Sequence, residues 1–193
     1  MIASPLPRIP YAKAAKTLLR QSVLTVVDEL IRKDGWAATS VATVANATGV
    51  SRQTIYNEFG SRQSIAEAYI LHRLDVLLDA VSAKVLGNPD IEHGFREAFE
   101  LFFDMVDEPV IQTVLAGDRS NLIDLVKVVN ERATDRLAAV ILRVRPRTSE
   151  SDAIIFADSL ARIAVAHAMA PTLPRPVAIE RVVRLSTVVL DAP

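Results

Sequence analysis

The chain has 193 residues, of which 50% are apolar, and it contains no cysteine. This composition is sufficient for a buried core, argues against wholesale disorder and leaves no disulfide or thiolate metal site. The net charge of −1 is unevenly distributed, because residues 1–65 carry 8 basic and 4 acidic side chains and the other 128 residues carry 14 and 19. A head of +4 on a body of −5 suits contact with a polyanion such as nucleic acid.

Several classes of protein are excluded by what the sequence lacks. No apolar run approaches the roughly 18 residues of a membrane span. Three prolines in the first ten residues interrupt any signal-peptide pattern, so we expect a cytoplasmic protein with no membrane partner. His72, His93 and His167 lie far apart, and no metal site is expected. No phosphate loop or nucleophile elbow is present, so neither enzymatic activity nor a cofactor is expected.

The predicted elements begin with a proline-rich segment, residues 1–10, which is expected to form a flexible arm. A helix follows from about Tyr11 to Asp34, because six apolar residues recur at i, i+4, i+7, i+8, i+11 and i+12. These residues are Leu19, Val23, Val26, Val27, Leu30 and Ile31. Gly35 is expected to end the helix as a left-handed cap, with Trp36 folded back onto the core.

The following helices are each predicted from capping residues, periodicity and turns. Serines at N-cap positions precede three of them: Ser40 before residues 41–48, Ser51 before residues 52–58, and Ser61 before a helix that ends near residue 86. After a turn at residues 87–90, helices are expected at 91–105, 110–115, 119–144, 149–170 and 177–190. The sequence therefore predicts an all-α fold of about nine helices.

Residues 39–65 carry the pattern that bears on function, TSVATVANATGVSRQTIYNEFGSRQSI. Two helices of about two turns joined by a tight turn at Gly49 are typical of a helix-turn-helix, whose second helix enters the major groove of DNA. Five apolar residues are expected to lock these helices together: Val44, Ala45, Val50, Ile55 and Phe59. Polar side chains are left facing outward on the second helix, and their groups pair with base edges and phosphates.

At ten positions this pattern resembles the TetR family of transcriptional repressors. The matching residues are Ser40, Val44, Ala45, Gly49, Val50, Ser51, Thr54, Ile55, Tyr56 and Phe59. The usual following serine–lysine step is Ser61-Arg62 here, whereas Gln53 replaces a frequent glycine and Glu58 a frequent histidine or tyrosine. These departures leave the operator sequence unpredicted.

The resemblance implies a homodimer that binds palindromic operator DNA and represses transcription. It implies three parts: an arm at 1–10, a three-helix DNA-binding domain at 11–60, and a ligand-binding and dimerisation domain at 61–193. The candidate base contacts are Arg52, Gln53, Thr54 and Asn57. The candidate phosphate contacts are Ser40, Ser51, Tyr56 and Arg62. In the arm, Arg8 is a candidate for contact with a minor groove.

The last two predicted helices are apolar on more than one face. A helix that is apolar all round must be buried, and at the end of a chain a second copy is the expected cover. The resemblance agrees, because the last two helices of the family form a four-helix dimer interface. Burial entirely within one chain is the alternative.

The resemblance also implies an effector cavity among the middle helices, coupled to the DNA-binding head through the fourth helix. Its expected lining is Phe95, Phe99, Phe102, Phe103, Met105, Leu115, Leu122 and Phe156. The nearest polar residues are Arg119 and Asn121, so a small hydrophobic ligand, such as a fatty acid or related lipid, is favoured. The alternative is a plain core, of which a phenylalanine stripe at helical spacing is more often typical than of a pocket. For the whole chain, the alternative is a helical interaction scaffold without sequence-specific DNA binding, which would be indifferent to Arg52→Ala.

Overall fold

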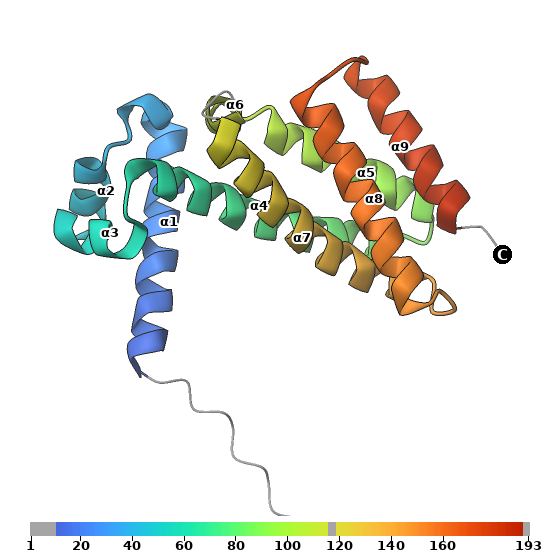
Figure 1. Ribbon diagram of the computed structural model, residues 1–193, viewed down its shortest axis with the longest axis horizontal. Helices are drawn as coiled ribbons and strands as arrows, with labels where there is room; N and C mark the ends of the chain where they lie inside the picture. Colours follow the sequence, from blue (N-terminus) through green and yellow to red (C-terminus); the bar gives the residue numbers. More distant parts are fainter. Residues whose placement is uncertain (1–10, 116–118, 191–193) are drawn as a thin grey trace, which may run out of the picture. The chain divides into compact units, whose positions relative to one another are not determined.

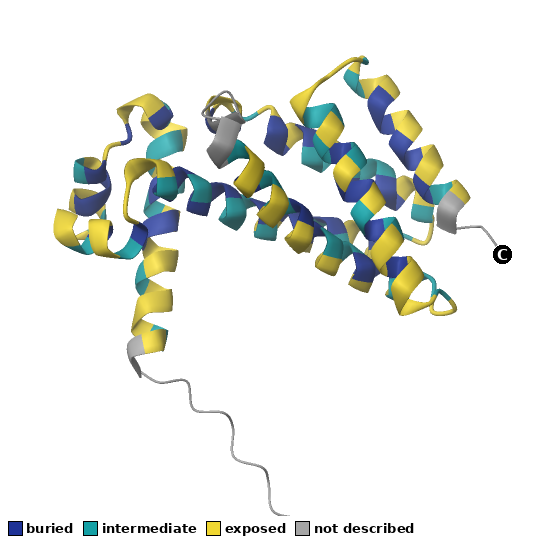
Figure 2. Ribbon diagram, viewed as in Figure 1, coloured by how far each residue is buried: buried dark blue, intermediate teal, exposed yellow. Residues whose placement is uncertain are grey.

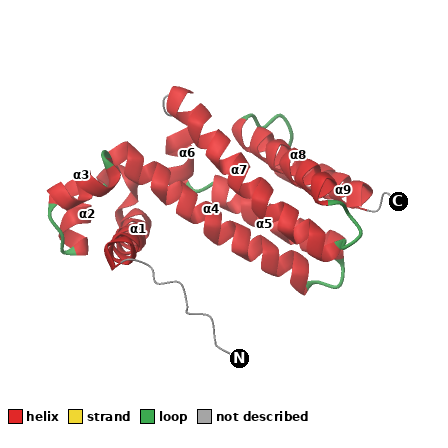
Figure 3. Ribbon diagram, turned by 60° about the horizontal axis from the view of Figure 1, so that its bottom comes forward, coloured by secondary structure: helices red, strands yellow, loops and turns green. Residues whose placement is uncertain are grey.

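The computed structural model describes residues 11–115 and 119–190, and all regular structure within these ranges is helical (Figure 3). The described part of the chain contains nine helices, which confirms the predicted all-α fold. They are α1 (Tyr11–Ala38), α2 (Val41–Thr48), α3 (Arg52–Phe59), α4 (Arg62–Gly87), α5 (Ile91–Val106), α6 (Pro109–Leu115), α7 (Arg119–Val144), α8 (Glu150–Met169) and α9 (Arg175–Leu190) (Figure 1). The predicted arm, with Arg8, lies outside the described residues.

The end of α1 differs from the prediction. Gly35 has φ 77° and ψ 164°, so its φ is positive but its ψ is not that of a left-handed helical cap. Glycine adopts this conformation without the steric penalty that a Cβ atom would bring. The helix resumes for one more turn to Ala38, and Trp36, which follows the break, is buried as expected.

The contacts divide the chain into two units, and the division falls inside α4, between Tyr69 and Ile70. The first unit has a core drawn from α1, α2, α3 and the first turns of α4: Val23, Val27, Val44, Ala45, Ile55, Phe59, Ile65, Ala66 and Tyr69. The hydroxyl of Tyr69 donates a hydrogen bond of 2.7 Å to Asp28 of α1. Because the first turns of α4 pack into this core, the division lies nine residues beyond the boundary at residue 60 that we expected from the sequence.

In the second unit, α7 and α8 lie side by side and antiparallel, joined by residues 145–149 (Figure 1). The buried face of α8 consists largely of small residues: Ala153, Ala157, Ala161 and Ala164. Small side chains permit close approach of the two helix axes. Helix α9 packs on α5, where Ile179 and Val183 meet Phe103. No helix in the described ranges has the length and apolarity needed to cross a membrane.

Helices α8 and α9 each bury one face and expose the other (Figure 2). On α9, Ile179, Val182 and Val183 are buried. On the outward faces of the two helices, six large apolar residues remain exposed: Ile154, Ile155, Met169, Val177, Leu185 and Val188. The apolar surface predicted on more than one face of these helices is therefore only partly covered within a single chain.

Candidate functional site

The turn between α2 and α3 is built from local hydrogen bonds that its residue types supply. Ser40 caps α2 by accepting a bond of 3.1 Å from the Thr43 amide, and the Thr43 hydroxyl accepts one of 2.7 Å from the Ser40 amide. Gly49 takes the left-handed conformation, φ 71° and ψ 21°, which ends α2. Ser51 then accepts from the Thr54 amide at 3.0 Å and starts α3.

The inner faces of α2 and α3 hold this turn against the rest of the unit. Val44, Ala45 and Ile55 are each 1% exposed, and Phe59 is also buried. Val50, in the turn, is half-buried. The inward orientation that the sequence predicted is confirmed for the four helical residues, and it orients the opposite face of α3 outward.

That outward face carries four of the candidate DNA contacts, namely the exposed residues Arg52, Gln53, Tyr56 and Asn57. The Gln53 side-chain amide donates to the Asn57 side-chain oxygen at 2.8 Å, one helical turn away. Gln53 thereby orients Asn57 and keeps its own carbonyl oxygen as an acceptor. The row of guanidinium, amide and hydroxyl groups matches the donors and acceptors on base edges and phosphates.

The other four candidates, Ser40, Ser51, Thr54 and Arg62, are engaged in contacts within the chain. Thr54 is half-buried, and its hydroxyl lies 2.8 Å from that of Ser51. Ser40 is exposed while its hydroxyl caps α2. Arg62 is turned toward the end of α1, where it donates to the backbone oxygens of Thr39, at 2.7 Å, and Trp36.

Sequence reasoning missed a cluster of charges between α1 and α3. Glu58, whose side chain is 7% exposed, pairs with Arg20 at 3.2 Å and Lys16 at 3.6 Å. The Arg20 guanidinium also stands 4.7 Å from the centroid of the Phe59 ring. The spacing held a clue, because Lys16 and Arg20 continue the stripe of Val23 and Val27 toward the N-terminus, where a cation faces the partner helix.

The second unit contains a small apolar cavity of about 70 Å³. Three of the eight predicted lining residues, Phe95, Phe99 and Phe102, line it. The rest of the wall, which the sequence did not reveal, comes from α4, α5, α7 and α8: Leu74, Leu77, Leu78, Val81, Ala98, Val129, Ala133, Leu137, Leu160, Ala161, Ala164 and Val165. Every lining side chain is apolar, which suits a hydrocarbon chain or a plain core.

The other predicted lining residues lie elsewhere. Met105 and Phe156 belong to the core packed around the cavity. Phe103 faces a separate cavity, and Leu122 lines an open groove between α7 and α8. The side chain of Leu115, like those of the expected polar anchors Arg119 and Asn121, lies outside the described residues.

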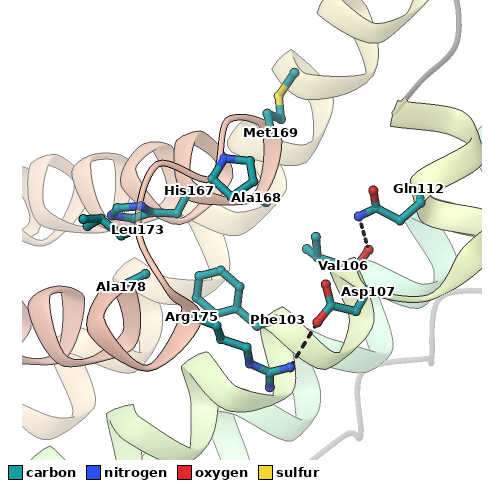
Figure 4. A pocket seen from close by; sticks show the side chains of 11 residues that line it. Phe103, Val106, Asp107, Gln112, His167, Ala168, Met169, Leu173, Arg175 and Ala178 are labelled. Atoms are coloured by element: carbon teal, nitrogen blue, oxygen red, sulfur yellow. Dashed lines mark hydrogen bonds and ion pairs between the residues drawn. The ribbon is translucent and has the colours of Figure 1, made fainter.

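The separate cavity measures about 420 Å³ and lies between the ends of α5 and α8 and the start of α9 (Figure 4). Its rim holds Arg175, which bonds Asp104 at 2.6 Å and Asp107 at 3.1 Å and lies 5.8 Å from the Phe103 ring centroid. The hydrogen bond to Asp104 is the main cause that raises the pKa of Arg175 above its ordinary value. Because two carboxylates already pair with its guanidinium, Arg175 fastens the start of α9 to the end of α5 rather than offering a free cation.

Comparison with known proteins accounts for this arrangement. Residues 24–69 match the model of bacterial regulatory proteins of the tetR family. Residues 90–187 match the model of the bacterial tetracyclin repressor C-terminal domain. The chain belongs to the TetR family. It is therefore a transcriptional regulator with a helix-turn-helix DNA-binding unit and a C-terminal regulatory unit.

Individual members of the family resemble the chain over most of its length. The HTH-type transcriptional regulator AlkX of Mycobacterium tuberculosis is 35% identical over 175 residues, which is 87% of this chain and 83% of that protein. Among solved structures, the TetR-family repressor AlkX from Dietzia sp. strain DQ12-45-1b, implicated in biodegradation of n-alkanes, has a TM-score of 0.69 at 24% identity, covering 88% and 94% of the two chains. Thermus thermophilus FadR, solved with lauroyl-CoA, has a TM-score of 0.57 at 20% identity, covering 87% and 93%. At these identities the solved structures establish the fold.

Proposed function

We propose that this TetR-family regulator is a repressor that binds a palindromic operator as a dimer and is released by a small hydrophobic ligand. The observation that carries the DNA-binding part is the face of α3, where Arg52, Gln53, Tyr56 and Asn57 are exposed on a helix locked from behind by Ile55 and Phe59. Its target would be chromosomal DNA, which assigns the protein to the cytoplasm.

Within this proposal, the side chains divide by the chemistry they offer. Arg52, Gln53 and Asn57 contact base edges, because guanidinium and amide groups form paired hydrogen bonds with guanine and adenine in the major groove. Thr54, the remaining candidate base reader, contributes through its own hydroxyl, which lies 2.8 Å from the hydroxyl of Ser51. Ser40, Ser51 and Tyr56 lie at the edges of the recognition surface and contact phosphates. These phosphate contacts set the register of the protein on the duplex.

Dimerisation through α8 and α9 supplies the second recognition helix. The exposed apolar residues on these helices, such as Ile155, Leu185 and Val188, support this assignment, because a second copy would cover them. Two copies of α3 would then enter successive major-groove faces about 34 Å apart. Any change in that separation weakens binding to one half-site, which gives a ligand its route of action.

The proposed ligand is a fatty acid or related acyl compound. The entirely apolar cavity supports a hydrocarbon chain, as do the neighbours, one solved with lauroyl-CoA and another implicated in biodegradation of n-alkanes. A cavity of about 70 Å³ is smaller than a ligand site of ordinary size, about 300–1,000 Å³, so the ligand must open it. Helix α4 supplies Leu74 and Leu77 to its wall, so opening would displace α4. A ligand that binds this opened state better weakens DNA binding by the same coupling energy.

The deciding experiment is selection of bound sequences from a random double-stranded DNA pool with purified protein. Enrichment of a palindrome whose half-sites lie about one helical turn apart is the expected result. The matched variant is Arg52→Ala, which keeps the fold and should lose enrichment at the one base pair that Arg52 reads in each half-site. If the wild-type chain enriches no sequence at low salt, even after delipidation, the protein is a helical scaffold without sequence-specific DNA binding.

The ligand is tested next, with the enriched duplex as probe. Dodecanoate and lauroyl-CoA are titrated into the protein–DNA complex, and DNA release is followed by fluorescence anisotropy. Release at saturating ligand supports induction. Unchanged DNA affinity with both compounds rules out the acyl assignment while leaving the DNA-binding proposal in place.

A further inference from the structure

Arg62, the first residue of α4, forms a contact that a simple phosphate-binding cation would not need. Its Nε donates to the backbone oxygen of Thr39 at 2.7 Å, and its Nη2 donates to the backbone oxygen of Trp36. The guanidinium carbon lies 4.3 Å from the centroid of the Trp36 ring. One side chain therefore makes two hydrogen bonds and a cation–π contact on the same four-residue segment, residues 36–39.

The position of these partners in the chain gives the contact its meaning. Thr39 directly precedes Ser40, the N-cap of α2, and Arg62 lies two residues after Gly60, the C-cap of α3. The hydrogen bond between them spans 23 residues and joins the entry of the helix-turn-helix to its exit. The two short helices are thus closed at their base by one side chain.

The chemistry at the end of α1, around Trp36 and Thr39, explains why an arginine fits there. Helix α1 ends here, and the Trp36 carbonyl oxygen, which accepts from the Thr39 amide at 3.1 Å, has a second lone pair for the Arg62 guanidinium. Thr39 is 2% exposed and Trp36 is 9% exposed, so water has little access to the tryptophan face. A planar guanidinium can donate to two carbonyl oxygens while it stacks on an indole, whereas the compact ammonium of lysine cannot match this geometry.

We propose that Arg62 is a positioning residue that ties the start of α4 to the end of α1 and the entry of α2, and so fixes the helix-turn-helix that lies between them in the chain, instead of contacting a DNA phosphate. The proposal rests on the proposed DNA-binding function. Under this proposal, Arg62 also takes part in the response to ligand, because it transmits a displacement of α4 to the helix-turn-helix of α2 and α3.

The contact is tested first in the free protein, where DNA plays no part. Trp36 is the only tryptophan in the chain, so the tryptophan emission reports on the surroundings of this one ring, on which the Arg62 guanidinium stacks. We expect Arg62→Lys and Arg62→Gln to change the Trp36 emission and to speed amide hydrogen exchange in α2 and α3 by about tenfold. Lys13→Gln, which removes an exposed cation of α1 far from Trp36 in the sequence, is the matched control and leaves both unchanged. Wild-type emission and exchange in both Arg62 variants would overturn the proposal.

The second test separates positioning from phosphate contact on DNA, with the duplex enriched by selection. We expect Arg62→Lys and Trp36→Leu each to weaken binding by about tenfold without changing the slope of log K against log salt. The double variant should bind DNA with the affinity of the more affected single variant, because both substitutions remove the same contact. If Trp36→Leu does not fold, Trp36→Phe takes its place in the cycle.

The phosphate alternative predicts a different pattern. There, Arg62→Lys retains affinity, Arg62→Gln lowers the salt slope by about 1, and the Trp36 variants have no effect. That pattern would overturn the positioning role. A failure to enrich any duplex would count against the proposed function alone, since fluorescence and exchange in the free protein still decide whether Arg62 holds the helix-turn-helix closed.

Discussion

Glu58 of α3 forms an ion pair with Arg20 of α1, in which Arg20 Nη1 and Glu58 Oε1 are 3.2 Å apart, and the same guanidinium stacks on the neighbouring Phe59 ring. The carboxylate is 7% exposed, whereas Arg20 is 44% exposed and Lys16 is 68% exposed. The recognition helix is thus tied to α1 by a buried anion with solvated partners. The ion pair also holds the Glu58 carboxylate on the side of α3 that faces α1. The acid is thereby kept off the outward face of α3, where it would repel a DNA phosphate.

The first prediction concerns this ion pair. Glu58→Gln should lower the free energy of unfolding by about 1 kcal/mol, a modest loss because water screens both cations. It should also steepen the salt dependence of DNA binding, because Lys16 and Arg20 become free to contact phosphates. Urea denaturation and binding titrations at several salt concentrations check both effects. Glu29→Gln, an exposed acid on α1, is the control; equal behaviour of the two variants would contradict the role of Glu58.

The second prediction concerns base reading by α3. Arg52→Ala should weaken operator binding by about 1–3 kcal/mol and relax specificity at one base pair in each half-site. The loss follows from the paired hydrogen bonds that a guanidinium makes to guanine. Anisotropy titrations against the selected duplex and single-base variants of it measure the effect. Lys33→Ala, an exposed cation outside α3, serves as the control. Unchanged affinity and specificity for Arg52→Ala would remove this residue from the recognition surface.

The third prediction concerns the dimer. Ile155→Glu on α8 and Val188→Glu on α9 should each raise the dimer dissociation constant by at least about tenfold, because an unpaired charge would be buried in the interface. The two residues are 56% and 62% exposed in one chain, so the substitutions should spare the fold of the monomer. Sedimentation equilibrium gives the constant, and Val76→Glu on α4 is an exposed control. Dimers of wild-type strength in both variants would place the interface elsewhere.

The fourth prediction concerns the apolar cavity. Ala161→Val on α8 should fill part of it and, because Ala161 also lies on the buried face that packs closely against α7, lower the free energy of unfolding by about 1–3 kcal/mol, with operator affinity unchanged. Dodecanoate should then release DNA at least about tenfold less readily, since the space for its chain is reduced. Ala139→Val, at an exposed position on α7, controls for the change of side chain. A wild-type response to dodecanoate would show that the ligand binds in another place.

The fifth prediction is a pH dependence at the contact between α4 and α5. The Lys84 ammonium lies 2.9 Å from Glu97, and this hydrogen bond is the main cause that lowers the pKa of Glu97 below its ordinary value of 4.5. A lowered carboxyl pKa stabilises the fold above pH 4.5, and this contribution is lost as pH falls through the folded-state value. Lys84→Gln should raise the Glu97 pKa toward 4.5, as measured by carboxyl NMR titration. Lys127→Gln, which leaves this contact intact, should not.

The helix-turn-helix could be predicted from the sequence nearly to the residue. Its bounds depend on interactions over three or four residues, such as the cap at Ser40 and the left-handed Gly49. Such local hydrogen bonds follow from residue type and spacing alone. The outward face of α3 follows in turn, because helical periodicity fixes which side opposes Ile55.

The cavity wall could be predicted only in part. Periodicity correctly marked Phe95, Phe99 and Phe102 as one apolar face of α5, but it does not say which helices that face meets. The partners from α4, α7 and α8, such as Leu77 and Ala161, come together through packing between distant segments. For the same reason, the sequence identified an apolar region but not its small volume.

Charged side chains show most clearly the difference between what the sequence determines and what only the tertiary structure decides. The sequence by itself determined a helical chain with a basic head and a helix-turn-helix, because these properties follow from composition, local capping and short periodic patterns. The TetR assignment came from the resemblance of ten positions in that motif to the family pattern. Only the tertiary structure decided that Arg62 bonds the end of α1 and that Glu58 pairs with Arg20. A long charged side chain can reach many partners, and the one it meets depends on contacts 23 and 38 residues away in the chain.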